Sequence, residues 1–147
     1  MKPRDRTLAD FRAEADWAET HEPVADITMG LELSYRANAR GHTRYQSRAT
    51  KQARENGQWL ARMTKARHHA SSFFDVLLVR WTRIYSGRER PYDDDNAGMA
   101  LKSIRDGFCD VLKVNDGDVS KVVFLQVEQV SGPKTGLRVR LYRKALT

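Results

Sequence analysis

The stretch FFDVLLVRWTRIY, residues 73–85, is dense in β-branched and aromatic side chains. Such residues are typical of strands, and Ser86 and Gly87 directly after them favour a turn. We predict a long strand here. The elements expected on either side of it decide the fold.

Three elements are expected before this strand. Residues 7–19 have the spacing of a short amphipathic helix, with Thr7 as its N-cap. Residues 27–35 alternate apolar and polar side chains, which predicts a half-buried strand. After a basic loop over 36–45, residues 46–66 form a helix with apolar positions at helical spacing.

Three further elements are expected after it. Apolar residues in 97–113 fall on one side of a helix, for which Asn96 is the natural N-cap. Strands over 119–130 and 137–142 follow, joined by a hairpin at 131–136. The order β-α-β-α-β-β predicts an α+β (mixed α/β) fold with a mixed four-stranded sheet and helices on one face. We expect one domain over 26–147, preceded by a helical N-terminal extension over 1–25.

Composition limits the class of protein. The chain has 147 residues and a single cysteine, Cys109, so disulfide frameworks and four-cysteine zinc sites are excluded. The longest apolar run, 76–79, is far shorter than the roughly 18 residues of a membrane span. The first residues contain no apolar stretch typical of a signal peptide. We therefore expect a cytoplasmic protein without a membrane partner.

Charge is distributed unevenly along the chain. The formal net charge is +7, and residues 31–90 alone carry +9. A basic excess of this size attracts polyanions, of which nucleic acid is the commonest; a basic surface kept for solubility is the alternative. The expected phosphate contacts are Arg36, Arg40, Arg44, Arg48, Lys51, Arg54, Arg88 and Arg90, with Arg138, Arg140 and Arg143 in second rank.

Aromatic residues offer a second kind of nucleic-acid contact. Trp59, Trp81 and Tyr85 could stack on bases, but an aromatic residue in a helix or strand belongs more often to the core. We rank the basic residues above them.

An acidic segment interrupts the basic chain. Residues 91–118 have a net charge of −4, and all their acids are Asp. Asp93, Asp94 and Asp95 come before the helix predicted over 97–113, and Asp116 and Asp118 come after it. Carboxylates at element ends can converge on Mg²⁺, which phosphate oxygens would also bind. The alternative is that Asp93–Asp95 only stabilise the positive end of the helix, by about 0.3–1 kcal/mol each.

Lys102 and Asp106 lie four residues apart on the polar side of that helix. Such a pair is most often a surface ion pair, although Lys102 could also neutralise charge that develops on a phosphate during hydrolysis. An EF-hand is excluded because Ala97 and Ile104 would stand at two of its ligand positions.

The acidic run DDDN at 93–96, followed by Lys102, Asp106 and the acidic turn at 116–118, resembles the RusA-type Holliday-junction resolvases. Their pattern is D-x-D-N, a helix bearing K-x-x-x-D and an acidic turn before a strand. The likeness covers about residues 27–144 in element order, and only 93–118 is specific in residue pattern. That family consists of homodimeric endonucleases of mixed α/β fold, common in phages and prophages.

The resemblance implies a function and a set of site residues. The family cuts four-way DNA junctions in recombination and repair, with Mg²⁺ as cofactor and Mn²⁺ as a substitute. Asp93 and Asp95 would bind the metal together with Asp116 or Asp118, and Lys102 would be the catalytic lysine. The implied catalytic set is Asp93, Asp95, Lys102 and Asp118. The alternatives are a non-catalytic basic DNA-binding protein whose Asp cluster is structural, and a protein directed at RNA.

Overall fold

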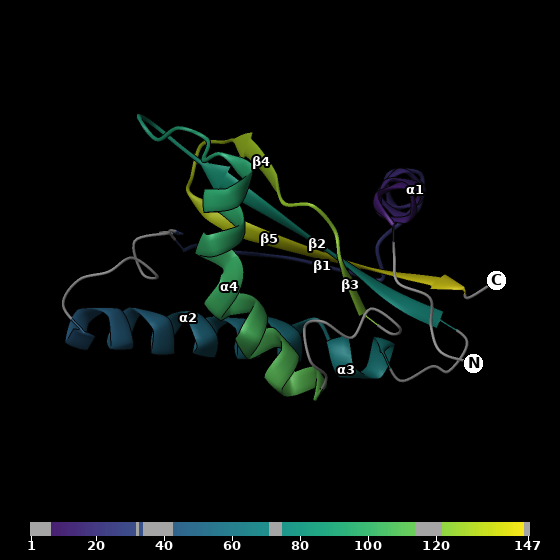
Figure 1. The fold of residues 1–147 in the computed structure, drawn as a ribbon, viewed down its shortest axis with the longest axis horizontal. Helices are drawn as coiled ribbons and strands as arrows, with labels where there is room; N and C mark the ends of the chain where they lie inside the picture. The colour runs from purple at the N-terminus through teal and green to yellow at the C-terminus, as the bar shows by residue number, and fades with distance from the viewer. Residues whose placement is uncertain (1–6, 32, 34–42, 71–74, 114–121, 146–147) are drawn as a thin grey trace.

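The computed structural model describes residues 7–31, 33, 43–70, 75–113 and 122–145 (Figure 1). They form a five-stranded mixed sheet with helices on both faces. Strand β2 (Asp75–Tyr85) is central and pairs antiparallel with β5 (Gly136–Ala145), which in turn pairs antiparallel with the edge strand β1 (Ala25–Met29). On its other side β2 pairs in parallel with β3 (Val122–Phe124) and β4 (Glu128–Ser131). The predicted α+β class is confirmed.

The sheet has five strands rather than the expected four because the strand predicted over 119–130 is divided. Val79 pairs with Phe124 and Thr82 pairs with Glu128, so two residues of β2 face three residues of its neighbour. One extra residue is the signature of a β-bulge. The N–H of Leu125 still donates to the carbonyl oxygen of Val79 at 2.9 Å, which keeps the two halves beside β2.

The predicted hairpin at 131–136 is wrong. Strands β4 and β5 do not pair with each other but lie on opposite sides of β2. The connection passes the end of β2, where the N–H of Gly132 donates to the carbonyl oxygen of Tyr85 at 2.9 Å. A central strand buried on both faces needs hydrogen-bond partners on both edges, and this arrangement supplies them.

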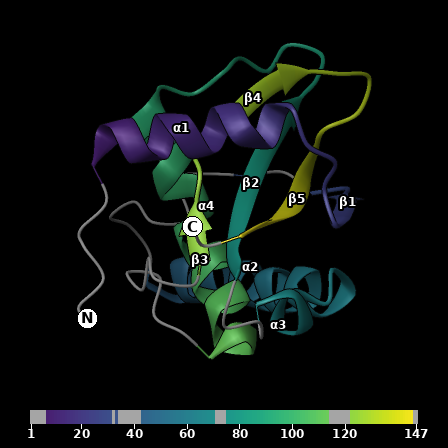
Figure 2. The same ribbon diagram turned by 90° about the vertical axis from the view of Figure 1, so that its right-hand side faces the viewer.

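Helices cover both faces of the sheet (Figures 1 and 2). Helices α2 (Thr43–Met63) and α4 (Asp94–Leu112) lie on one face with the short α3 (Ala66–His69), and α1 (Leu8–Glu19) lies on the other. Helix α1 begins as predicted, with Thr7 and Asp10 forming a capping box. Helix α2 ends earlier than predicted because Lys65 adopts a left-handed backbone conformation at φ 54°.

Alternate side chains of β2 pack into two separate hydrophobic cores, one on each face of the sheet. Leu77, Val79 and Trp81 face α2 and α4, whereas Val76 and Leu78 face α1. The strand predicted over 27–35 is shorter than expected, because it ends at Met29. Leu33 beyond it is also buried on the α2 and α4 side, and position 35 lies outside the described residues. No helix in the described ranges is long and apolar enough to cross a membrane.

Helices α2 and α4 cross in backbone contact. A Cβ atom on Gly57 would lie 1.9 Å from the carbonyl oxygen of Ile104, and one on Gly107 would lie 1.9 Å from that of Arg54. Beside this crossing the guanidinium of Arg54 donates to the Asp110 carboxylate through two nitrogens, at 2.6 and 2.8 Å. The crossing therefore fixes the position of α4, which carries the candidate site.

Candidate functional site

Helix α4 begins at Asp94, three residues earlier than predicted. Asp93 is its N-cap, and the predicted cap Asn96 is wrong. One Asp93 oxygen accepts from the backbone N–H of Asn96 at 2.8 Å, and the other accepts from the Asn96 side-chain amide at 3.3 Å. A short carboxylate in extended backbone before a helix is well placed for this bond. The structural role considered for the Asp run is therefore present at Asp93.

The polar side of α4 borders a hollow of about 340 Å³. Residues that lie three or four apart, or at multiples of this spacing, share one side of a helix. The residues that line the hollow are Asp94, Asp95, Gly98, Met99, Lys102 and Arg105. Two of the four residues of the implied catalytic set, Asp95 and Lys102, are thus on one side of the same helix.

Lys102 lies about two helical turns beyond the two carboxylates. A rise of about 1.5 Å per residue places its Cα roughly 10–12 Å from those of Asp94 and Asp95 along the axis. Lys102 is exposed and lines the same hollow as the two carboxylates.

Two charged lining residues, Asp94 and Arg105, do not belong to the implied catalytic and metal-binding sets. Asp94 accepts a hydrogen bond from the Gln126 side-chain amide at 3.2 Å, and the Arg105 guanidinium lies over the Phe124 ring at 4.4 Å. Residues near the bulge between β3 and β4 thus hold both side chains. The helical spacing of Asp94, Lys102 and Arg105 is the signal that could have identified them together.

The metal prediction is only partly covered by the described residues. Asp94 and Asp95 offer exposed carboxylate oxygens, the kind of donor that Mg²⁺ prefers. Among the described residues there is no group of three His, Cys, Asp or Glu side chains arranged to hold a metal ion. The expected third ligand, Asp116 or Asp118, lies outside them, so the convergence of the two clusters stays a prediction.

The expected phosphate contacts fall into three sets. Arg48 and Lys51 are exposed on α2, and Arg88 and Arg90 are exposed after β2. Arg54 is also exposed, but its guanidinium is held by Asp110. Arg36, Arg40 and the side chain of Arg44 lie outside the described part.

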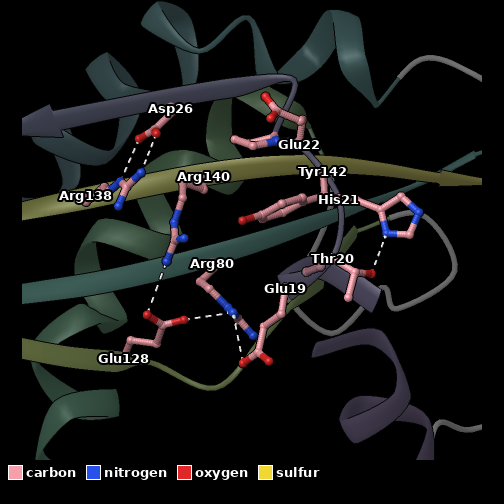
Figure 3. A pocket seen from close by; sticks show the side chains of 12 residues that line it. Glu19, Thr20, His21, Glu22, Asp26, Arg80, Glu128, Arg138, Arg140 and Tyr142 are labelled. Carbon is pink, nitrogen blue, oxygen red and sulfur yellow. Dashed lines mark hydrogen bonds and ion pairs between the residues drawn. The ribbon is translucent and has the colours of Figure 1, made fainter. Parts of the chain in front are cut away.

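The second-rank arginines Arg138 and Arg140 point away from α4. They lie on the sheet face that carries α1, in a hollow of about 580 Å³ between the end of α1 and the strands (Figure 3). Arg138 donates to Asp26 through two nitrogens, and Arg140 and Arg80 both reach Glu128, at 3.2 and 2.8 Å. Each of these arginines is already paired with a carboxylate, and Glu19 lies 3.9 Å from Arg80 as well, so this hollow is a poor phosphate site.

The three aromatic residues considered for base stacking differ in exposure. Trp81 is fully buried against Phe108, as a core residue should be, and Tyr85 is partly buried. Trp59 on α2 is 43% exposed and belongs to neither core cluster.

The chain matches no protein-family model, no curated protein and no solved structure.

Proposed function

We propose that the protein is a Mg²⁺-dependent endonuclease of the RusA type that cuts four-way or other branched DNA. The observation that carries this proposal is the placement of Lys102 in one hollow with Asp94 and Asp95. A helix that only needed acids near its N-terminus would not require a lysine two turns later on the same side. The residue pattern over 93–118 supplies the reaction class by resemblance.

The proposed reaction is hydrolysis of a phosphodiester. A water oxygen attacks phosphorus, the bond from phosphorus to the leaving sugar oxygen breaks, and that oxygen takes up a proton. Mg²⁺, when bound, would polarise the phosphate and acidify the water. Asp94 and Asp95 would hold it, together with an acid from 116–118. Lys102 and Arg105 would neutralise the negative charge that grows on the phosphate oxygens.

The proposal extends to partners. DNA arms would contact the exposed cations Arg48, Lys51, Arg88 and Arg90. A four-way junction has two-fold symmetry, so paired nicks require two active sites and favour a homodimer. We place the protein in the cytoplasm, in recombination or repair of phage or prophage type.

The test is a cleavage assay on a labelled four-way junction, with linear duplex and single strand of the same sequence beside it. Each substrate is incubated with Mg²⁺ or with EDTA. Asp95→Asn removes one carboxylate charge without changing shape, and Asp16→Asn on the exposed side of α1 is the matched control. We expect symmetrical, Mg²⁺-dependent nicks with the wild type and the control, and a loss of at least about 100-fold with Asp95→Asn.

A second function, a non-catalytic DNA-binding protein, is favoured by one observation. Both oxygens of Asp93 are occupied by Asn96, as they would be in a purely structural cap. Binding to junctions without cleavage under Mg²⁺ or Mn²⁺ would support this function. Wild-type nicking by Asp95→Asn would contradict the assignment of the site.

A further inference from the structure

The exposed side of α2 carries an aromatic residue among cations. Trp59 is 43% exposed and Met63, one turn later, is 52% exposed. Helical spacing places Arg48, Lys51 and Arg62 on the same side as Trp59, because each lies within about 80° of it at 100° per residue. All three are exposed.

Charge selects the kind of partner for this surface. Residues 48–67 contain six basic side chains and a single acid, Glu55. Arg54 is neutralised by Asp110, and the remaining cations are exposed: Arg48, Lys51, Arg62, Lys65 and Arg67. An apolar protein partner gains nothing from so many like charges, whereas a nucleic-acid strand presents both phosphates and flat bases.

The cations and Trp59 are spread along the α2 axis. Arg48 and Arg62 lie about 21 Å apart along the α2 axis, with Trp59 between them. A strand that follows the helix could place phosphates on cations at both ends of this interval and a base at Trp59. Inside a duplex the bases are stacked on one another, so only an unpaired base can offer its face to the indole.

We propose that Trp59 is a stacking platform for an unpaired base, flanked by Arg48, Lys51 and Arg62 as phosphate contacts. This proposal shares with the proposed function the premise that the partner is DNA, and it assigns to α2 the recognition of single-stranded character at a branch point. It does not depend on cleavage or on a metal.

The experiment measures binding in EDTA, so that no cleavage occurs. The ligands are an oligothymidylate, in which every base is unpaired, and a blunt duplex of similar length. Trp59→Ala and Trp59→Phe are compared with Met63→Ala, a matched control on the same exposed side. Quenching of indole fluorescence that is lost in Trp59→Phe reports on Trp59, because Trp17 and Trp81 are both retained in that variant.

We expect Trp59→Ala to bind oligothymidylate roughly 5-fold to 100-fold more weakly, while Trp59→Phe and Met63→Ala stay within about threefold of the wild type. Duplex binding should change less than about threefold in all three variants. Arg62→Gln should lower the slope of log affinity against log salt by about 0.7, and Trp59→Ala should leave this slope unchanged.

Three outcomes would overturn the inference. Trp59→Ala could bind oligothymidylate as the wild type does, or Met63→Ala could lose as much affinity as Trp59→Ala. Trp59→Ala could instead convert a dimer to a monomer in sedimentation, which would make this surface a contact between copies. If one of these outcomes is found but junctions are still cleaved, the proposed nuclease function stands without the Trp59 platform. If single strands bind through Trp59 but no junction is cleaved, the nuclease function is contradicted and the Trp59 platform stands.

Discussion

Asp93 caps helix α4, and the resemblance implies that it also binds the metal. Two substitutions distinguish these two roles. Asp93→Ser keeps a short side-chain acceptor for the N–H of Asn96, whereas Asp93→Ala removes it. We expect the alanine variant to lower the free energy of unfolding by about 1 kcal/mol and the serine variant to lower it far less. Urea unfolding measures this difference.

Cleavage by the same two variants then decides the second role of Asp93. If its carboxylate also binds the metal, both variants lose activity although only the alanine variant loses stability. Junction cleavage at the wild-type rate by Asp93→Ser would restrict Asp93 to the cap, leaving Asp94 and Asp95 as the carboxylates at the start of α4.

Two carboxylates make stability depend on pH. Hydrogen bonds from Arg54 and Gln58 lower the pKa of Asp110, and a hydrogen bond from Arg138 lowers the pKa of Asp26. A pKa that is lower in the folded state contributes stability above the unfolded value of about 3.9, and this contribution is lost as pH falls through the folded value. We expect Asp110→Asn to be less stable than the wild type at pH 7, and the difference to shrink below about pH 4. A constant difference from pH 7 to pH 2 in urea unfolding would contradict this cause.

At the scale of elements, the crossing of α2 and α4 depends on two glycines. Because a Cβ on Gly57 or Gly107 would meet a carbonyl oxygen at 1.9 Å, the helices would have to move apart. We expect Gly57→Ala and Gly107→Ala each to lower the free energy of unfolding by about 2 kcal/mol or more. Gly98→Ala on α4 is the control, since a Cβ there meets nothing within 4 Å, and it should raise stability by about 0.5–1 kcal/mol. Thermal unfolding of the three variants tests the crossing, and equal behaviour of all three would contradict it.

Local pattern predicted the elements whose signals are local. The capping pair Thr7 and Asp10 and the β-branched run in β2 identified α1 and β2 nearly to their ends. Strand pairing was harder to predict from the sequence. The one-residue bulge and the connection that passes the end of β2 depend on neighbours distant in sequence. Asn96 was chosen as a cap because it stands next to the apolar repeat, whereas the helix gains a further turn from Asp93 onward.

Across the whole molecule, only the part of the candidate site that lies on a single helix could be predicted from the sequence. The sequence prediction placed Asp95 before the helix, so the side that it shares with Lys102 follows only from the earlier start of α4 at Asp94. The contacts that hold their neighbours, Gln126 with Asp94 and Phe124 with Arg105, join separate parts of the chain and leave no periodic signal. The exposure of Trp59 likewise depends on where α4 crosses α2, which the pattern of α2 alone does not determine.

Substitutions in helix α1 test whether the N-terminal extension contributes to the stability of the fold. Ala18 is 1% exposed and packs with Val76, Leu78 and Tyr142 on the sheet face opposite α4. We expect Ala18→Glu to lower the free energy of unfolding by at least about 2 kcal/mol, because it buries a charge without a partner. Ala13→Glu makes the same change on the exposed side of the same helix and should have an effect within about 0.5 kcal/mol.

The two variants also separate stability from activity. Because α1 and α4 lie on opposite faces of the sheet, folded Ala18→Glu should still nick junctions at a rate close to that of the wild type, well below its unfolding temperature. Chemical unfolding combined with the cleavage assay measures both properties in one preparation. A stable Ala18→Glu protein would show that α1 can leave the sheet without cost. Lost cleavage in a folded variant would show that the helix acts on the α4 site through the strands between them.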